Sequence, residues 1–152
     1  MATNNLTARA RIRVRNTPEK AFAAFVDAGQ MSRFWFTRDD NGLEAGENST
    51  WSLGSGPDAF SFEVRVIDVT PAERIVIEWP ADDGRFRQVE WQFEATDDGE
   101  TIVSIEESGF TGDADTMVAQ VLDSQGGFNQ VIVAAKAWIE HGVAINVVSD
   151  HA

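Results

Sequence analysis

Hydrophobic and polar residues alternate along much of this chain and then change to a helical spacing near its end. In residues 8–15, four apolar residues alternate with four arginines. A period of two is typical of a strand with one buried face. Further segments of strand character follow at about 49–54, 59–69, 73–79, 85–96 and 101–109.

The arginines of segment 8–15 have two interpretations. They could form an anion site, or they could be a solvated face that pairs with carboxylates of a neighbouring strand. Opposite charges directly across a strand pair stabilise it, so we favour the second interpretation. Turns are expected at 54–58, 82–84 and 97–99, where glycine follows small or acidic residues.

Two short helices are predicted after the first strand. Thr17 is a suitable N-cap, Pro18 suits the first helical position, and Gly29 is expected to end this helix. A second short helix is expected over about 30–35. The chain therefore reads as strand, two helices, strands and one long final helix.

The final helix is predicted from Thr116 to about Val148. Its centre contains Gly126 and Gly127, and each glycine costs a helix about 1 kcal/mol relative to alanine. We therefore expect a kink or break over 123–127, with Asp123 or Ser124 capping the second half. The glycines could let the helix cross the sheet closely, or they could let a ligand approach the backbone.

Composition excludes several classes of function. The chain has 25 acidic and 12 basic residues, a formal charge of −13, so nucleic acid and anionic membrane surfaces are poor partners. Cysteine is absent, and only one histidine lies away from the C-terminus, so we expect no cofactor and no metal site. We also expect no signal peptide, no membrane insertion and a cytoplasmic location.

Large rings are abundant, with five Trp, ten Phe and no Tyr. The run Phe34-Trp35-Phe36 cannot direct all three rings into one core from a helix or strand. At least one ring must face a cavity, a lid or solvent. The residues that we expect to line a ligand pocket, or to fill the core, are Trp35, Phe36, Phe62, Trp79, Trp91, Phe128 and Trp138.

Candidates for acid–base chemistry are few. His141 and Asp123 are the weak catalytic candidates, and a surface or capping role competes for His141. Glu106 and Glu107 are adjacent on one strand, so they point to opposite faces and cannot act together. Charged strand residues that could point inward are Glu63, Arg65, Glu78, Glu90 and Glu106.

Several short motifs together resemble a known superfamily. They are Thr17-Pro-Glu-Lys-Ala-Phe, Phe34-Trp-Phe-Thr, Leu43-Glu-Ala-Gly, Ile75-Val-Ile-Glu-Trp, Trp91-Gln-Phe-Glu, Ser108-Gly-Phe and Lys136-Ala-Trp-Ile-Glu-His-Gly. Their order resembles the helix-grip (SRPBCC, START-like) superfamily of lipid-transfer domains, birch-pollen allergens and polyketide cyclases. The nearest likeness is to the branch named for homologues of the activator of the heat-shock-protein-90 ATPase.

The resemblance implies an α+β helix-grip fold over about residues 8–148, in one domain spanning 1–152. It implies a curved antiparallel sheet of about six strands around a long C-terminal helix, with a cavity between them. It does not carry over an activity, because members range from carriers to enzymes to co-chaperones.

Three functions stay open at this point. The first is binding of a small apolar or aromatic ligand in the cavity. The second is a cyclase or hydrolase activity that uses a cavity carboxylate or His141. The third is a stress-response, co-chaperone-like interaction with a chaperone partner through an exposed apolar surface. A homodimer is compatible with each of them.

Overall fold

A computed structural model of the chain describes residues 6–53, 57, 59–81 and 83–150. Most of the turn expected at 54–58, and Asp82 of the turn at 82–84, lie outside these residues. The turn at 97–99 is present, and Gly99 adopts a positive φ of 81° there.

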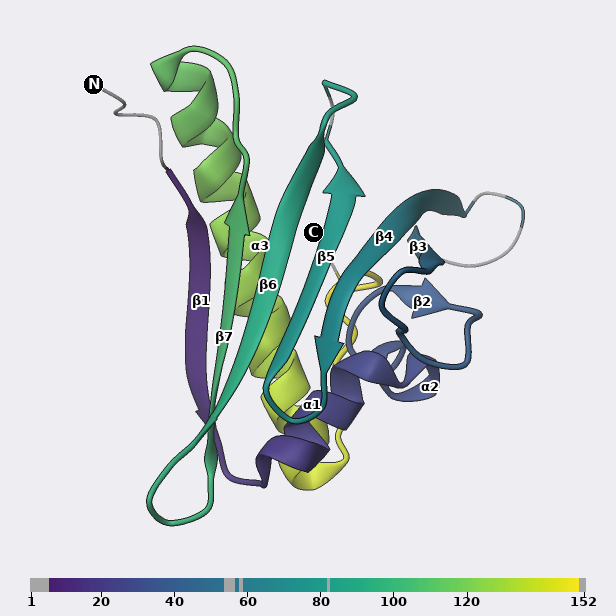
Figure 1. Cartoon of the computed structure of the whole chain (residues 1–152), viewed down its shortest axis with the longest axis vertical. Coiled ribbons are helices and arrows are strands. Elements are labelled where there is room, and N and C mark those ends of the chain that lie inside the picture. Colours follow the sequence, from purple (N-terminus) through teal and green to yellow (C-terminus); the bar gives the residue numbers. More distant parts are fainter. Residues whose placement is uncertain (1–5, 54–56, 58, 82, 151–152) are drawn as a thin grey trace.

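One antiparallel sheet of seven strands forms the body of the described protein (Figure 1). Its spatial order is β1-β7-β6-β5-β4-β3-β2. The six strands expected from the sequence are present within about a residue of their predicted ends. The seventh, β2, has only two residues, which is too short to leave an alternating pattern. The strands are β1 (Ala8–Val14), β2 (Thr37–Arg38), β3 (Asn48–Leu53), β4 (Phe60–Thr70), β5 (Arg74–Pro80), β6 (Phe86–Ala95) and β7 (Thr101–Ser108).

The outer face of β1 behaves as a solvated, paired surface. Arg9 lies opposite Glu106 of β7 and forms an ion pair with it at 3.1 Å. Arg13 binds Glu100 at 2.8 Å. The favoured interpretation of the arginine face is thus confirmed for Arg9, whereas the partner of Arg13 lies immediately before β7 rather than on it.

Two short helices follow β1. Helix α1 (Pro18–Val26) begins as predicted, because the Thr17 hydroxyl accepts a hydrogen bond from the Lys20 amide. The predicted end at Gly29 is wrong: α1 ends at Val26, and Asp27 caps the next helix, α2 (Ala28–Met31). The second helix was expected at 30–35. It begins earlier because the Asp27 carboxylate accepts from the Gln30 amide.

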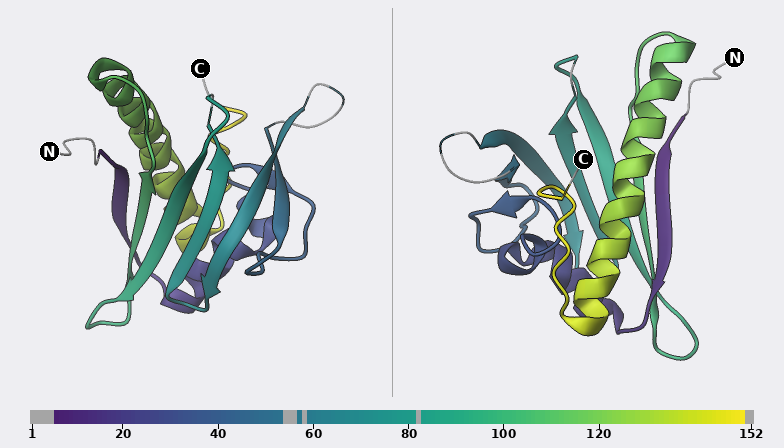
Figure 2. Two further views of the ribbon diagram at one scale, coloured as in Figure 1. Left: turned by 45° about the horizontal axis from the view of Figure 1, so that its top comes forward. Right: turned by 180° about the vertical axis from the view of Figure 1, so that it is seen from behind.

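Helix α3 (Ala114–His141) is continuous over 28 residues (Figure 2). The predicted break at 123–127 is wrong, and neither Asp123 nor Ser124 acts as a cap. The N-cap is Asp113, the residue immediately before the helix. The helix ends at His141 rather than near Val148, because Gly142 adopts the left-handed conformation with φ 65°.

Helix α3 crosses one face of the sheet and packs chiefly along β1 (Figure 1). The C-terminal half of α3 is tied to β1 and to the residue that follows it. Lys136 donates to the Arg13 carbonyl, and the Arg15 amide donates to Glu140. After α3, residues 143–150 return between α3 and the β2–β4 side of the sheet, as the right-hand view of Figure 2 shows. This C-terminal segment and α3 bound the candidate site.

Candidate ligand pocket

A cluster of aromatic rings fills the centre of the molecule. Trp35 contacts Phe36 at a ring-centroid distance of 4.8 Å and Trp79 at 6.1 Å. Trp79 also stacks on Phe128 of α3 at 5.8 Å, with the two planes only 6° apart. Trp51, on β3, is fully buried among these rings. Much of the space between α3 and the sheet is therefore occupied by the protein's own side chains.

A pocket of about 720 Å³ opens beside this cluster, between α3, the end of β3 and the C-terminal segment. Leu53 and Leu122 on its wall are exposed, so the pocket communicates with solvent and is not a closed hollow. Its lining consists of Trp35, Phe36, Leu53, Trp79, Leu122, Asp123, Ser124, Gly126, Gly127, Phe128, Gln130, Val147 and Val148.

Four of the seven aromatic residues selected from the sequence lie on this lining: Trp35, Phe36, Trp79 and Phe128. The other three lie outside it. Trp91 is buried against Phe25, Phe62 packs on Phe36, and the Trp138 indole donates to Gln30 at 3.1 Å. The sequence could not separate the two groups, because a hydrophobic pattern does not show whether a ring meets another ring or lines a pocket.

The paired glycines of α3 are not explained by close packing. A methyl group added at Gly126 or at Gly127 would meet no atom within 4 Å among the described residues. The interpretation that they let the helix cross the sheet closely is therefore wrong for this chain. Both glycines line the pocket. Both are exposed, so at these two positions the lining consists of helix backbone without a side chain.

The C-terminal segment is held against the pocket by Asn146. Its side-chain amide donates to the carbonyls of Ser32 and Trp35, at 2.9 and 3.0 Å, and its oxygen accepts from the amides of Val148 and Ser149. The Val147 amide adds a bond to the Phe34 carbonyl. This arrangement places Val147 and Val148 on the pocket lining.

Glu107 is the functional candidate that sequence reasoning missed. It is only 1% exposed on the inner face of β7, and one oxygen accepts a 2.7 Å hydrogen bond from the Trp79 indole. Its other oxygen, Oε1, has no partner in the described part of the chain. The Arg87 guanidinium lies 3.7 Å away. The sequence pattern could have identified Glu107 as an inward residue, because it continues the alternation of the buried residues Thr101, Val103 and Ile105.

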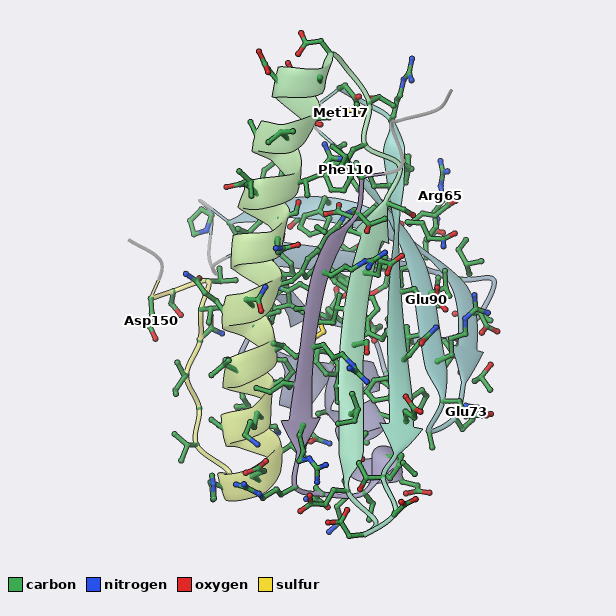
Figure 3. The ribbon with its side chains drawn as sticks, turned by 90° about the vertical axis from the view of Figure 1, so that its left-hand side faces the viewer. Arg65, Glu73, Glu90, Phe110, Met117 and Asp150 are labelled. Carbon is green, nitrogen blue, oxygen red and sulfur yellow. The ribbon has the colours of Figure 1, made fainter. Side chains whose placement is uncertain are left out.

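The strand charges proposed instead of Glu107 do not point inward. Glu63, Arg65 and Glu106 are exposed, and Glu78 and Glu90 are half-exposed on the outer face. Arg65 and Glu90 point away from α3 in Figure 3. The expectation that Glu106 and Glu107 point to opposite faces is confirmed.

His141 lies outside the pocket. Its side chain is 70% exposed at the last residue of α3, 3.5 Å from Glu140. Asp123 is on the pocket lining, exposed at its rim. Among the described residues, no group of histidine and acidic side chains is arranged to hold a metal ion, and no helix is long and apolar enough to cross a membrane.

A half-buried carboxylate, Asp40, is hydrogen-bonded through both of its oxygens. Burial would raise its pKa, but hydrogen bonds from Arg38 and Ser49, the Arg38 charge and the Gly42 amide outweigh burial and lower the pKa from 3.8 to about 2. The same Arg38, which is completely buried, donates to the carbonyls of Phe25 and Val26. This network fixes the end of α1 to β2 and is structural.

Comparison with known proteins assigns the family. A family model described as "Activator of Hsp90 ATPase homolog 1-like protein" matches residues 15–135, which is most of the chain. The chain belongs to this family. No curated protein matches the chain at a significant level.

Solved structures agree with the fold of this Activator of Hsp90 ATPase homolog 1-like family. Protein SSP2350 from Staphylococcus saprophyticus is 26% identical, with a TM-score of 0.75, over 92% of this chain and 96% of that one. The Aha1 dimer from Colwellia psychrerythraea is 17% identical, with a TM-score of 0.70, over 90% and 98%.

DynU16, from the dynemicin biosynthetic locus, is 16% identical, with a TM-score of 0.77. The match covers 91% of this chain but 48% of DynU16, so this chain spans about half of its length. At these low identities the likeness to DynU16 and to the Colwellia protein shows the fold alone.

Proposed function

We propose that this protein binds a small apolar or aromatic ligand in the pocket between α3 and the sheet. The pocket volume is in the range of drug-sized ligand sites. One wall is formed by the rings of Trp35, Phe36, Trp79 and Phe128, which suit a flat apolar ligand. Asp123, Ser124 and Gln130 supply the few polar groups that would orient it.

The observation that carries the proposal is the glycine pair. Two glycines in the middle of a helix cost about 2 kcal/mol of stability relative to alanine. No neighbour among the described residues requires them, because a methyl group at either position would meet nothing. A ligand that lies against the helix backbone accounts for their presence on the pocket lining.

The proposal is tested with a variant that fills the pocket beside the glycine pair. Gly127→Leu places a side chain in the pocket, where the structure has room for it, so the variant should fold. Binding would be followed by tryptophan fluorescence against a library of lipids and aromatic compounds, since Trp35 and Trp79 line the pocket. We expect a saturable change for the native chain and its loss in Gly127→Leu.

Val133→Ala is the matched control for that experiment. Val133 is exposed on the same helix and is not on the pocket lining, and alanine also raises helix propensity there. It should bind like the native chain. If Gly127→Leu binds every hit of the library as well as Val133→Ala does, the proposed pocket is wrong.

The chaperone-related function of the family name is the second candidate, supported by exposed apolar residues. Val118 and Leu122 are one turn apart on α3 and are 45% and 63% exposed, and Phe60 is 65% exposed. The Colwellia relative is described as a dimer, so the same residues could serve self-association. Sedimentation of the native chain and of a Val118→Ser, Leu122→Ser variant separates a dimer from a monomer.

A further inference from the structure

The described lining of the pocket carries a single charged side chain, and its charge is negative. Among the described residues, Asp123 is the only ionisable side chain on the lining, and the remaining polar side chains there, Ser124 and Gln130, are neutral. Asp123 makes no ion pair or hydrogen bond with another side chain within the described ranges. Its negative charge is therefore uncompensated by this part of the protein.

Basic side chains near the pocket are already engaged elsewhere. Arg38 is buried in its pair with Asp40, and the Arg33 guanidinium lies over the Trp138 ring at 5.5 Å. Arg87 lies over the Phe110 ring at 4.3 Å. Figure 3 shows Phe110 beside Met117, near the start of α3 and away from the C-terminal segment. An anionic ligand would find no basic partner on the described lining.

The buried Glu107 acts on the pocket through Trp79. The Trp79 indole lines the pocket, and its N–H donates to the Glu107 carboxylate at 2.7 Å. A hydrogen bond from the indole N–H to an anion moves electron density into the ring, which makes its face more attractive to a cation. Arg87 opposes this effect, but at the longer distance of 3.7 Å.

We propose that the pocket selects organic cations, with an apolar body against the rings and a positive group near Trp79 and Asp123. In this assignment Asp123 contacts the ligand, and Glu107 is a positioning residue that acts through Trp79. The inference rests on the proposed function, and it adds the charge class of the ligand. It separates this pocket from carriers of fatty acids and other anions.

The test compares three probes of similar size and different charge. Benzyltrimethylammonium is the cation, neopentylbenzene is its uncharged isostere, and 3-phenylpropanoate is the anion. Each would be titrated into the native chain, with the indole N–H signals of the five tryptophans followed by ¹H–¹⁵N NMR. We expect the cation to bind about 3- to 30-fold more tightly than the isostere, and the anion to bind least.

Two variants with matched controls identify the groups responsible. Asp123→Asn and Glu107→Gln each remove a charge with little change of shape, and in Glu107→Gln the new amide oxygen could still accept from Trp79. Each should weaken cation binding about two- to fivefold and leave binding of the isostere unchanged. The controls are Asp115→Asn on the same helix and Glu106→Gln on the outer face of β7, which should change neither.

The outcomes distinguish the existence of the ligand pocket from its preference for cations. Equal affinity for cation and isostere, or tighter binding of the anion, overturns the charge preference and leaves the pocket standing. Equal losses in Glu106→Gln and Glu107→Gln would reduce the effect to net charge and overturn the role of Trp79. No saturable shift with any of the three probes overturns both the pocket and its preference.

Discussion

The two halves of α3 differ in what they contribute to the molecule. The half from Phe128 to His141, here the rigid end, buries Phe128, Val131, Ile132, Ala134 and Ala135. The half from Ala114 to Gly127, here the open end, buries only Met117. It also exposes Leu122 and carries the two glycines that no described neighbour requires. One continuous helix thus packs mainly along its rigid end, while most of its pocket-lining residues lie in the open end and two, Phe128 and Gln130, follow at the start of the rigid end.

This difference explains why the helix does not break at its glycines. Helical stability in proteins comes mostly from the packing of an apolar face, and the rigid end supplies that packing. Asp113 caps the first turn of the open end. The open end is therefore held by this cap, by a hydrogen bond from the Arg9 amide to Gln125, by partial packing of Val121 and by continuity with the rigid end.

The largest expected effect is on packing of the rigid end. Ile132→Ala, at a residue 2% exposed, should lower the free energy of unfolding by about 3 kcal/mol, because it removes buried apolar atoms and leaves a cavity. Leu122→Ala at the open end should change it by less than about 0.5 kcal/mol. Urea denaturation of both variants measures the difference, and similar losses would show that the two halves are equally packed.

The next effect concerns Asp40, whose partner Arg38 binds the carbonyls at the end of α1. The pKa of Asp40 is lower in the folded chain than its ordinary value of 3.8, so the folded state gains stability when the carboxyl is ionised. That gain is complete above about pH 4 and is lost as the pH falls to about 2. A shift of just under two pKa units corresponds to about 2.5 kcal/mol at most, and most of it is lost between pH 4 and pH 2.

Asp40→Asn tests this origin of acid sensitivity. The variant should be less stable than the native chain at neutral pH, and the gap should shrink by about 2 kcal/mol between pH 4 and pH 2. Chemical denaturation at a series of pH values gives the two curves. Parallel curves across this interval would mean that Asp40 does not stabilise the fold in this way.

A smaller effect, of opposite sign, is expected at the open end. Gly126→Ala and Gly127→Ala should each raise the free energy of unfolding by about 1 kcal/mol, because alanine is the better helix former and the structure has room for its methyl group. Thermal unfolding of the two single variants and the double variant measures this. A loss of stability would show that the glycines serve packing after all.

The sequence was a good guide where burial repeats with a regular period. The alternation in six strands and the helical spacing of the final helix were enough to predict the α+β architecture. The same reasoning failed at 123–127, because glycine propensity is a local quantity and the continuity of α3 depends on packing in the rigid end. It also failed for the two-residue strand β2, which has no period.

The candidate site was predicted only in part, for a related reason. A strand pattern shows which face a ring occupies, but not whether that ring meets another ring or a pocket. Trp79 and Trp91 both face inward, yet only Trp79 lines the pocket. Glu107 could have been placed inward from its register with Val103 and Ile105, but Glu106 was preferred, and it faces solvent.

The smallest expected effect is local and concerns how the pocket is closed. Asn146 fixes the C-terminal segment through two bonds to the carbonyls of Ser32 and Trp35, while most of that segment is exposed. Asn146→Ala should therefore release Val147 and Val148 from the segment 32–35 without lowering the global free energy of unfolding by more than about 1 kcal/mol. Amide hydrogen exchange gives the readout, because the Val147 amide is bonded to the Phe34 carbonyl. Its exchange should accelerate at least tenfold while amides of the rigid end keep their protection. If the protection of Val147 and that of the rigid end fell together, the C-terminal segment would belong to the cooperative core. The contrast between the rigid end and the open end would then be confined to α3.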